Sequence, residues 1–343
     1  MKCIIDNISI RSIATCLPEK VVEMSSYAEK FGEKEVEATI KASGIERLHF
    51  TEIGETAADL CYRAAELIIE EEKIDRNSID GLVLVSQMFD YFNPPTSCVL
   101  QGRLGLPKDC VCFDISYGCS GYIYGLFQAA TLISSGACNN VLVLAGDTYS
   151  KNEKTEKASV MVFGDAGSAT LVSKGDSSLA FHIMTNGYDY KTVLSDRLGY
   201  RKWPYNRSLD YQPDDVSMHG DDVFSFIVSV APKSIKTALE MVGWDKDDVD
   251  FYAFHQATKI TIDFMTKKLK LAHPERAPFD IQNYGNTGPT TVPLVLTDYP
   301  HRAEGIDTSN WKKVILSAYG VGLSWGSIAC DLSKTKIYRP INQ

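Results

Sequence analysis

The segment Phe113-Asp114-Ile115-Ser116-Tyr117-Gly118-Cys119 has a counterpart later in the same chain, Phe279-Asp280-Ile281-Gln282-Asn283-Tyr284-Gly285-Asn286. Each copy is predicted to be a short apolar strand that ends in a tight Tyr-Gly turn. The residue after the glycine is a cysteine in the first copy and an asparagine in the second. If the copies are related halves of one fold, Cys119 and Asn286 occupy equivalent corners and can face each other across a pseudo-two-fold axis. A thiol opposite an amide at paired strand ends is a layout for acyl chemistry.

Three further pairs of segments occur in the same order in the two halves of the chain. One apolar run precedes each quoted segment, another follows it, and each half then closes with a Gly-Ser strand. The pairs are 79–85 with 249–255, 141–147 with 314–320, and 167–174 with 326–334. Four pairs in one order indicate an internal duplication. We place the boundary near Lys174, which gives an N-terminal half over 1–174 and a C-terminal half over 175–343.

Composition narrows the class of protein. At 343 residues and 44% hydrophobic, the chain is long enough for two packed halves. The net charge of -9 argues against nucleic acid or an anionic membrane surface as the main partner. No apolar run approaches the roughly 20 residues of a membrane span. Asp6 stands where a signal peptide would have its apolar core, so no export signal is expected.

The cysteine pattern bears on compartment and metal binding. Nine scattered cysteines suit reduced thiols in a cytoplasm better than a disulfide framework. Cys110 and Cys112 would share one face of a strand, but no His or Cys pair at zinc spacing accompanies them. Small buried side chains are therefore favoured there, and neither a metal site nor a cofactor is expected.

Strand-like apolar runs alternate with helix-like stretches, which is typical of a largely parallel α/β sheet. The spacing of apolar residues predicts helices over 57–72, 120–136 and 221–242. The segment 188–215 is rich in Tyr, Arg, Asp, Pro and Gly without a clear period, so a loop or lid is expected there.

Cys119 is the first candidate for chemistry. It follows a glycine turn and opens a predicted helix, and at a helix N-terminus the free N–H groups and the macrodipole favour a thiolate. Gly118 and Gly121 on either side would let a substrate approach closely. Cysteines in α/β cores are usually inert, so position alone does not assign catalysis.

Two further candidates and a loop accompany it. His255 ends an apolar strand, at the edge of the sheet where α/β sites collect, although a satisfied half-buried histidine is the alternative. Asn286 follows a glycine, which is also ordinary turn chemistry. The stretch Gly320-Val321-Gly322-Leu323-Ser324-Trp325-Gly326 lacks the spacing of a dinucleotide fingerprint and leads into a strand. Its N–H groups near Cys119 would instead suit a developing oxyanion.

Taken together, these residues resemble the thiolase superfamily, and within it the β-ketoacyl-ACP synthase III family, over nearly the whole chain. The resemblance implies a thiolase-like α/β fold, with two duplicated mixed-sheet halves in a five-layer αβαβα arrangement. It also implies a homodimer, in which the loop 88–97 reaches the partner's acyl pocket. The motifs that carry it, in the family's order, are Asp114-Ile115-Ser116-Tyr117-Gly118-Cys119-Ser120-Gly121, Phe163-Gly164-Asp165-Ala166-Gly167, Met218-His219-Gly220-Asp221-Asp222-Val223-Phe224, His255-Gln256-Ala257, Gly285-Asn286-Thr287 and Gly320-Val321-Gly322-Leu323-Ser324-Trp325-Gly326.

The resemblance implies an acyltransferase of the type that initiates fatty acid synthesis. It would join an acyl-CoA or acyl-ACP primer to malonyl-ACP by decarboxylative Claisen condensation and release 3-oxoacyl-ACP. Cys119 would carry the acyl group as a thioester, and His255 and Asn286 would stabilise the enolate formed on decarboxylation. The backbone N–H groups of Cys119 and Val321 would form the oxyanion hole. The residues expected to contact substrate are Lys157, Gln256, Tyr319 and Gly320.

Departures from the family's pattern leave the acyl donor open. Ala38 stands where many members have a tryptophan that stacks on the adenine of coenzyme A. An arginine used for the same nucleotide falls on Ala42, and another falls on Lys157. A carrier protein is acidic and would instead need a basic rim, for which Lys41, Arg47 and Lys157 are candidates.

Other functions of the superfamily remain as alternatives. The chain could be a ketosynthase or acyltransferase of a specialised pathway, or a non-catalytic ketosynthase-like partner subunit. Partner subunits typically lose the nucleophile, which is present here. A hydroxymethylglutaryl-CoA synthase would need a glutamate where Gln87 stands, and the second cysteine of a thiolase is missing from 318–326. Acyl chain length and pathway are left open by the sequence.

Overall fold

The fold is organised around a 10-stranded mixed sheet to which both halves of the chain contribute. The structure is a computed structural model, and it describes residues 1–151, 160–195, 217–218 and 220–343. Its strands are β1 (Lys2–Leu17), β2 (Lys20–Glu23), β3 (Arg47–Phe50), β4 (Gly81–Val85), β5 (Val111–Ile115), β6 (Asn140–Thr148), β7 (Asp165–Thr185), β8 (Val193–Leu194), β9 (Ser217–Met218), β10 (Phe251–Phe254), β11 (Val314–Gly320), β12 (Ser324–Cys330), β13 (Lys336–Ile337) and β14 (Ile341–Asn342). The order in the large sheet is β10-β11-β12-β7-β6-β4-β5, with β1 beside β7 and with β13 and β14 beside β1.

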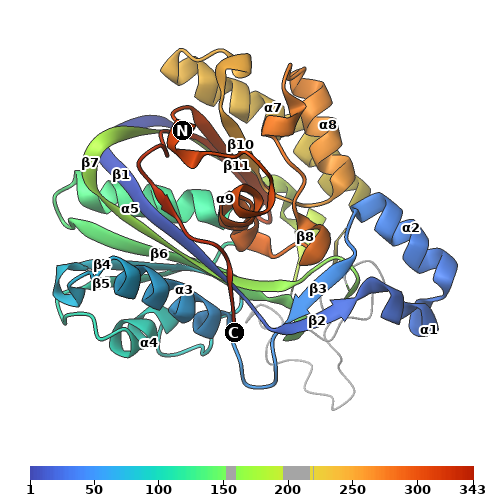
Figure 1. Ribbon diagram of the computed structural model, residues 1–343, viewed down its shortest axis with the longest axis horizontal. Coiled ribbons are helices and arrows are strands. Elements are labelled where there is room, and N and C mark those ends of the chain that lie inside the picture. Colours follow the sequence, from blue (N-terminus) through green and yellow to red (C-terminus); the bar gives the residue numbers. More distant parts are fainter. Residues whose placement is uncertain (152–159, 196–216, 219) are drawn as a thin grey trace.

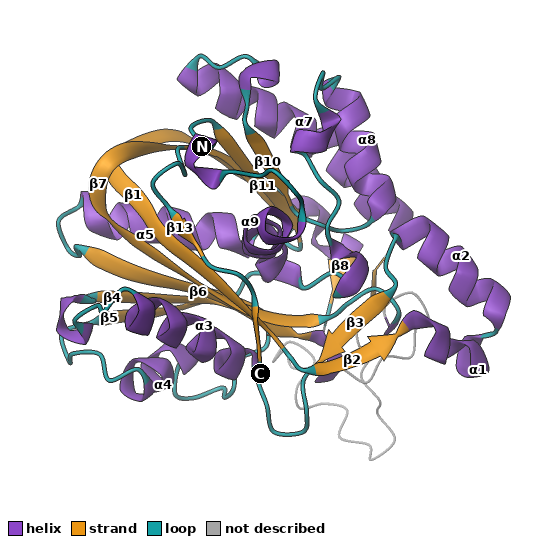
Figure 2. Ribbon diagram, in the orientation of Figure 1, coloured by secondary structure: helices purple, strands orange, loops and turns teal. Residues whose placement is uncertain are grey.

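Helices lie in three layers that are separated by the two halves of the sheet (Figure 2). The described helices are α1 (Ala28–Phe31), α2 (Glu33–Ser43), α3 (Ala57–Glu71), α4 (Thr96–Arg103), α5 (Gly121–Ser134), α7 (Gly220–Val242), α8 (Lys259–Leu269) and α9 (Thr291–Arg302), of which α1 and α2 lie outside these layers, beside β2 and β3. One hydrophobic cluster lies under α3 and α4, a second surrounds α5 and α9, and a third lies under α7 and α8. The αβαβα order and the three helices predicted from apolar spacing are thereby confirmed.

Each half repeats the same strand arrangement, as the duplicated segments predicted. In the first half β4 pairs in parallel with β5 and β6, and β6 pairs antiparallel with β7. In the second half β10 pairs in parallel with β11, and β11 pairs antiparallel with β12. The strand predicted for the second copy of the quoted segment is wrong, because Ile281–Asn283 forms a 3-10 turn. The buried Asp280 accepts a hydrogen bond from the Tyr284 hydroxyl at 2.6 Å, which closes this turn.

Two long strands join the halves. The early part of β7 pairs with β6 and its last part pairs with β12, so Lys174 lies inside a strand that serves both halves. The strand β1 runs antiparallel to β7 and curves with it (Figure 1). The pairing register shifts between Asp6 and Ile8, where Asn7 has a φ of 60°. Bulges of this kind bend a strand, which lets β1 follow both half-sheets.

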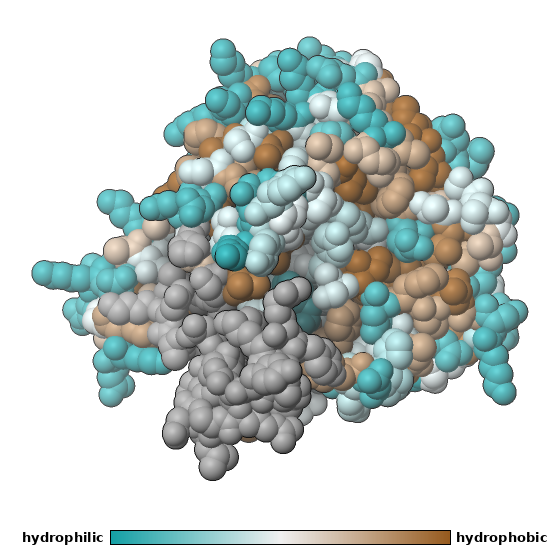
Figure 3. Space-filling view, turned by 180° about the vertical axis from the view of Figure 1, so that it is seen from behind, coloured by the Kyte–Doolittle hydropathy of each residue, from teal (hydrophilic) through white to brown (hydrophobic). Residues whose placement is uncertain are grey.

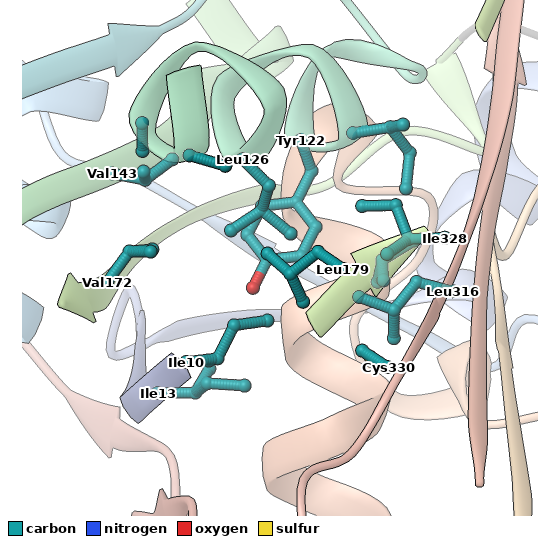
Figure 4. Packing of buried hydrophobic residues seen from close by; sticks show 14 of the residues in the cluster. Ile10, Ile13, Tyr122, Leu126, Val143, Val172, Leu179, Leu316, Ile328 and Cys330 are labelled. Carbon is teal, nitrogen blue, oxygen red and sulfur yellow. The ribbon is translucent and has the colours of Figure 1, made fainter. Parts of the chain in front are cut away.

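The central helix α5 is anchored by its apolar faces. Tyr122 points from α5 into the cluster that contains Leu126, Leu179 and Ile328 (Figure 4). Its hydroxyl lies 2.9 Å from Thr170 Oγ1, so the one polar atom of this buried ring is paired. The first turn of the helix, and the loop that carries Cys119, are therefore held by core packing.

The predicted loop over 188–215 is described only in part. Gly187–Thr192 forms a 3-10 helix, β8 follows, and residues 196–216 lie outside the described part of the chain. Within the described residues, no helix has the length and apolar character needed to cross a membrane.

Candidate active site

Cys119 lies in the loop between β5 and α5, directly before Ser120, the N-cap residue of the helix. The residue as a whole has intermediate exposure, and the glycine-rich loop approaches it closely. A β-carbon added at Gly320 would lie 2.7 Å from the Cys119 β-carbon, closer than real side chains pack. Only glycine at position 320 allows this approach, so the predicted proximity of the loop to Cys119 is confirmed.

The glycines beside Cys119 serve packing instead of substrate approach, which corrects the expectation for Gly118 and Gly121. A β-carbon at Gly118 would collide with the side chain of Gln87, and one at Gly121 would collide with Val85. Both glycines therefore face protein. They let the nucleophile loop settle onto the end of β4.

Burial raises the pKa of the Cys119 thiol to about 12, and the charge of Asp147 adds to this effect. Burial therefore opposes the thiolate that the helix N-terminus was expected to favour, because desolvation outweighs the hydrogen bond from the backbone of Cys119. Asp147 is itself buried and accepts hydrogen bonds from Ser86 Oγ, from the N–H groups of Gln87 and Met88, and from Tyr149. Burial raises its pKa to about 7 despite these donors.

His255 follows β10 and is almost fully buried, with 2% of its surface exposed. The backbone N–H of His255 donates to the carbonyl of Ser317 at 2.7 Å, which fixes the backbone at the end of the strand. Its Nδ1 lies 2.6 Å from the hydroxyl oxygen of Thr291. Burial lowers the pKa of the ring to about 3, so His255 is a neutral imidazole at physiological pH.

Tyr319 and Gly320 bring His255 and Cys119 to the same place. The Tyr319 hydroxyl donates to the carbonyl of His255 at 3.0 Å, and the two rings meet edge to face at 5.4 Å. The next residue, Gly320, contacts Cys119. The structure thus brings together Cys119 and His255, which are 136 positions apart in the sequence (255 − 119).

Asn286 is buried, and its backbone bridges to the other half of the chain. Its N–H donates to the carbonyl of Val162 at 2.8 Å, and its carbonyl accepts from the N–H of Gly164 at 3.1 Å. The side-chain oxygen accepts from the N–H of Gly288 at 3.0 Å. The amide nitrogen of Asn286 has no hydrogen-bond partner among the described residues, so it can donate to a ligand.

A chain of buried hydroxyls connects the nucleophile loop to the glycine-rich loop. Ser120 Oγ lies 2.6 Å from Ser324 Oγ, and Ser324 Oγ donates to the carbonyl of Val321 at 2.6 Å. Within the described part of the chain, the backbone N–H groups of Cys119 and Val321 donate to no other residue, and the Cys119 N–H interacts only with its own thiol. Two free donors on loops joined in this way are suited to bind an oxyanion.

Two residues predicted to contact substrate, Gln256 and Lys157, are not placed by the structure where a substrate contact could be described. Gln256 is fully buried, and its amide nitrogen donates to the carbonyls of Phe254 and Pro278 while its oxygen accepts from the N–H of Asp280. With every polar atom bound to backbone, Gln256 has a structural role, and we omit it from the proposed substrate contacts. Lys157, like His219 of the 218–224 motif, lies outside the described residues.

Three functional candidates were not predicted from the sequence: Asp147, Thr291 and Ser324. Asp147 lies near the C-terminal end of β6, a position where α/β sites collect, and this could have indicated it. The contacts of Thr291 with His255 and of Ser324 with Ser120 join residues distant in sequence, so no local pattern indicates them. Among the described residues, no group of three or more His, Cys, Asp or Glu side chains could hold a metal ion.

A cavity of 520 Å³ opens beside the glycine-rich loop, between α7 and the start of β12. The rings of Phe226 and Trp325 meet edge to face at 5.5 Å on its wall. Among the described residues, its charged lining consists of the carboxylates Asp189 and Asp222.

Known proteins match this chain over nearly its whole length. The sequence model of the 3-oxoacyl-[acyl-carrier-protein (ACP)] synthase III family matches residues 113–187, and the model of the C-terminal domain of the same family matches residues 239–332. The beta-ketoacyl-[acyl-carrier-protein] synthase III 2 of Streptomyces coelicolor is 31% identical, with 93% of this chain and 92% of that protein covered. The synthase III 1 of Vibrio vulnificus is 30% identical, with 91% and 95% covered. The crystal structure of a 3-oxoacyl-(acyl-carrier protein) synthase from Burkholderia xenovorans superposes with a TM-score of 0.92 at 31% identity, covering 100% of this chain and 99% of that one.

Proposed function

This chain belongs to the 3-oxoacyl-[acyl-carrier-protein] synthase III family of condensing acyltransferases, and we propose that it works through an acyl-Cys119 intermediate. It would join an acyl thioester primer to malonyl-ACP with loss of carbon dioxide. The observation that carries the proposal is the convergence at Tyr319 and Gly320, where consecutive residues contact His255 and Cys119.

The first half-reaction is transfer of the acyl group to Cys119. The sulfur attacks the primer carbonyl, the bond from that carbon to the carrier sulfur breaks, and the thiol proton leaves with the carrier. The N–H groups of Cys119 and Val321 would hold the oxyanion that forms in between. Because burial raises the pKa of the thiol, only a small fraction of the substrate-free protein carries a thiolate at neutral pH.

The second half-reaction is condensation. The malonyl thioester loses carbon dioxide, and the electron pair of the broken bond moves into an enolate. The amide nitrogen of Asn286 and a ring N–H of His255 would donate to the enolate oxygen. The enolate carbon then attacks the acyl carbonyl, the bond to Cys119 breaks, and 3-oxoacyl-ACP is released.

The test is intact-protein mass spectrometry followed by product analysis. The protein is exposed to acyl thioesters of several chain lengths, and malonyl-ACP is then added. We expect one acyl mass on Cys119 from at least one donor, and then loss of that mass with release of carbon dioxide and a 3-oxoacyl product. A panel that gives neither acyl mass nor carbon dioxide would overturn the proposal.

Removing the Ser324 hydroxyl is expected to slow both half-reactions. Ser324→Ala breaks the link between Ser120 and the Val321 carbonyl, so the two oxyanion donors lose their fixed separation. One net hydrogen bond of about 1 kcal/mol corresponds to a loss of roughly fivefold to tenfold in rate. Acylation and condensation rates measured separately check this, and Ser120→Ala should act on both rates in the same way. An effect on condensation alone would contradict the assignment.

The preferred primer donor is expected to be a carrier protein instead of coenzyme A. Ala38 and Ala42 both lie exposed on α2 and present no ring or guanidinium to an adenine. Loss of two such contacts should weaken coenzyme A binding by about tenfold. Of the basic candidates described by the structure, Lys41 is exposed and Arg47 pairs with Glu23 at 2.8 Å. We therefore propose Lys41 as the better contact for an acidic carrier.

The measurement compares Cys119 acylation by one acyl group on the two carriers. The carrier-protein form should react faster at equal concentration. Ala38→Trp should raise the rate with the coenzyme A form and leave the rate with the carrier-protein form unchanged. Faster acylation of the unmodified chain from coenzyme A would refute the preference.

We propose a homodimer formed along the edge strand β5. Within the described residues, β5 has a strand partner only on the side of β4, and its residues are partly exposed. Its Asp114 accepts from the N–H groups of Thr96 and Ser97, both at 2.8 Å, which holds the 88–97 loop against this edge. Figure 3 shows apolar surface on the side of the molecule away from α1 and α2.

Three aromatic side chains near this edge are exposed: Phe113 by 38%, Tyr91 by 57% and Phe92 by 66%. Such a group is easier to explain at an interface than in water. We expect sedimentation to give a dimer, and Phe113→Glu to give a monomer at the same concentration. A wild-type monomer at all concentrations would contradict the proposal.

The nine free cysteines support placing this enzyme in a reducing cytoplasm.

A further inference from the structure

The hydroxyl of Thr291 contacts Nδ1 of the buried His255 ring. Nδ1 lies 2.6 Å from Thr291 Oγ1, and Thr291 is completely buried. We propose that Thr291 is a positioning residue that donates its proton to Nδ1 and so holds His255 with its own proton on Nε2. The inference rests on the proposed function, because Nε2–H is then the group that donates to the enolate oxygen.

The lengths of the two contacts favour this direction. The Thr291 hydroxyl has a single proton and two neighbours, His255 Nδ1 at 2.6 Å and the carbonyl of Gly288 at 3.1 Å. That carbonyl already accepts the backbone N–H of Thr291 and does not depend on the hydroxyl. In the opposite arrangement Nδ1–H would donate to Thr291 Oγ1, and the hydroxyl would donate to the Gly288 carbonyl, which is the longer of the two contacts. The shorter contact therefore takes the proton.

A charged ring would not depend on this contact in the same way. An imidazolium has a proton on both nitrogens, so Nδ1 could only donate to Thr291. Burial disfavours that form and lowers the pKa of His255 to about 3. With a neutral ring, one proton is shared between two positions, and the partner of Nδ1 determines which position is used.

Gly288 connects the contact between Thr291 and His255 to Asn286. The N–H of Gly288 donates to Asn286 Oδ1 at 3.0 Å, which turns the amide nitrogen of Asn286 away as a free donor. The carbonyl of the same residue lies against the Thr291 hydroxyl. Gly288 has a φ of +60°, and a β-carbon there would collide with the ring of Tyr149. One glycine turn thus contacts both proposed enolate donors.

The first test reads the ring proton directly. Protein labelled with ¹⁵N-histidine gives nitrogen signals for six histidines, and His255→Gln identifies those of His255 by their loss. We expect a protonated Nε2 and an unprotonated Nδ1 in the unmodified protein. A protonated Nδ1 would overturn the proposal, because Thr291 would then accept from the ring and donate to Gly288. This readout needs no substrate, so it is independent of the proposed function.

The second test uses substitutions at Thr291. Thr291→Val keeps the shape and removes the hydroxyl, and Thr291→Ser keeps the hydroxyl. Carbon dioxide release from malonyl-ACP should fall about tenfold to 100-fold in the valine variant and return to within about threefold in the serine variant. Acylation of Cys119 should be nearly equal in both, which excludes a loss of fold.

The outcomes separate the two proposals. Unchanged carbon dioxide release in a folded Thr291→Val protein would refute the role of Thr291 and leave the proposed function intact. If the unmodified protein neither accepts an acyl group nor releases carbon dioxide, the proposed function fails while the nitrogen signals still report the tautomer. If the valine variant does not fold, the serine variant and the nitrogen signals of the unmodified protein decide.

Discussion

Cys119→Ala is expected to abolish acyl-enzyme formation while the protein stays folded. The side chain is the proposed acceptor of the acyl group, and alanine has no atom that could replace the sulfur. The β-carbon that packs against Gly320 is retained in alanine, so the loop geometry should persist. Intact-protein mass spectrometry after exposure to acyl donors measures the result, and circular dichroism checks the fold.

Cys98→Ala provides a matched control, because Cys98 is the exposed cysteine among the nine. It should leave the acyl mass unchanged. Because Cys98 is exposed, alkylation alone would not single out Cys119. Acyl mass that persists in Cys119→Ala would show that the nucleophile is another residue.

The raised pKa of Cys119 gives this prediction a pH dependence. Below a pKa of about 12, the thiolate fraction rises with pH, so alkylation of Cys119 should accelerate about tenfold per pH unit. An ordinary thiol would level off above its reference pKa of about 8.5. Alkylation rates at Cys119, followed by peptide mapping between roughly pH 7 and pH 10, check the difference. A plateau near the ordinary value would show that the helix N-terminus offsets burial.

Local patterns predicted the elements that carry the site. The spacing of apolar residues predicted both ends of α5 to within two residues. The Gly118-Cys119 sequence before it correctly predicted that Cys119 lies at the helix N-terminus. The strand before His255 was also predicted from the sequence, because the residues of β10 form a continuous apolar and buried segment. Repetition between the halves then indicated that these strand ends lie near one another. Each of these inferences depends on residues close together in the sequence.

The errors lie where distant residues decide the outcome. The sequence suggested that Gly118 and Gly121 leave room for a substrate, but the side chains of Gln87 and Val85 fill the space beside them. The second Tyr-Gly segment read as a strand, but a buried Asp280 folds it into a turn. The pKa of Cys119 depends on burial and on Asp147, which is 28 positions away (147 − 119). Three-dimensional packing sets all three, and a single sequence does not display it.

His255→Ala and Asn286→Ala are each expected to block decarboxylation of malonyl-ACP and to permit acylation of Cys119. Their proposed partner is the enolate oxygen, which exists only in the second half-reaction. Removal of one such donor typically costs about 100- to 1,000-fold in rate. The amide nitrogen of Asn286 and the Nε2 of His255 have no partner within the described part of the chain, so both are available for this task.

The two half-reactions should therefore separate in these variants. Each protein should accumulate the acyl form on mixing with primer and keep it after malonyl-ACP is added, with carbon dioxide release measured in parallel. His273→Ala is a matched control, since His273 is exposed and bonds to Glu275 at 3.1 Å, and it should behave as the unmodified protein. Normal carbon dioxide release in either active-site variant would remove that residue from the enolate site. Failure to acylate would instead place it in the first half-reaction, where His255 would act on the thiol of Cys119.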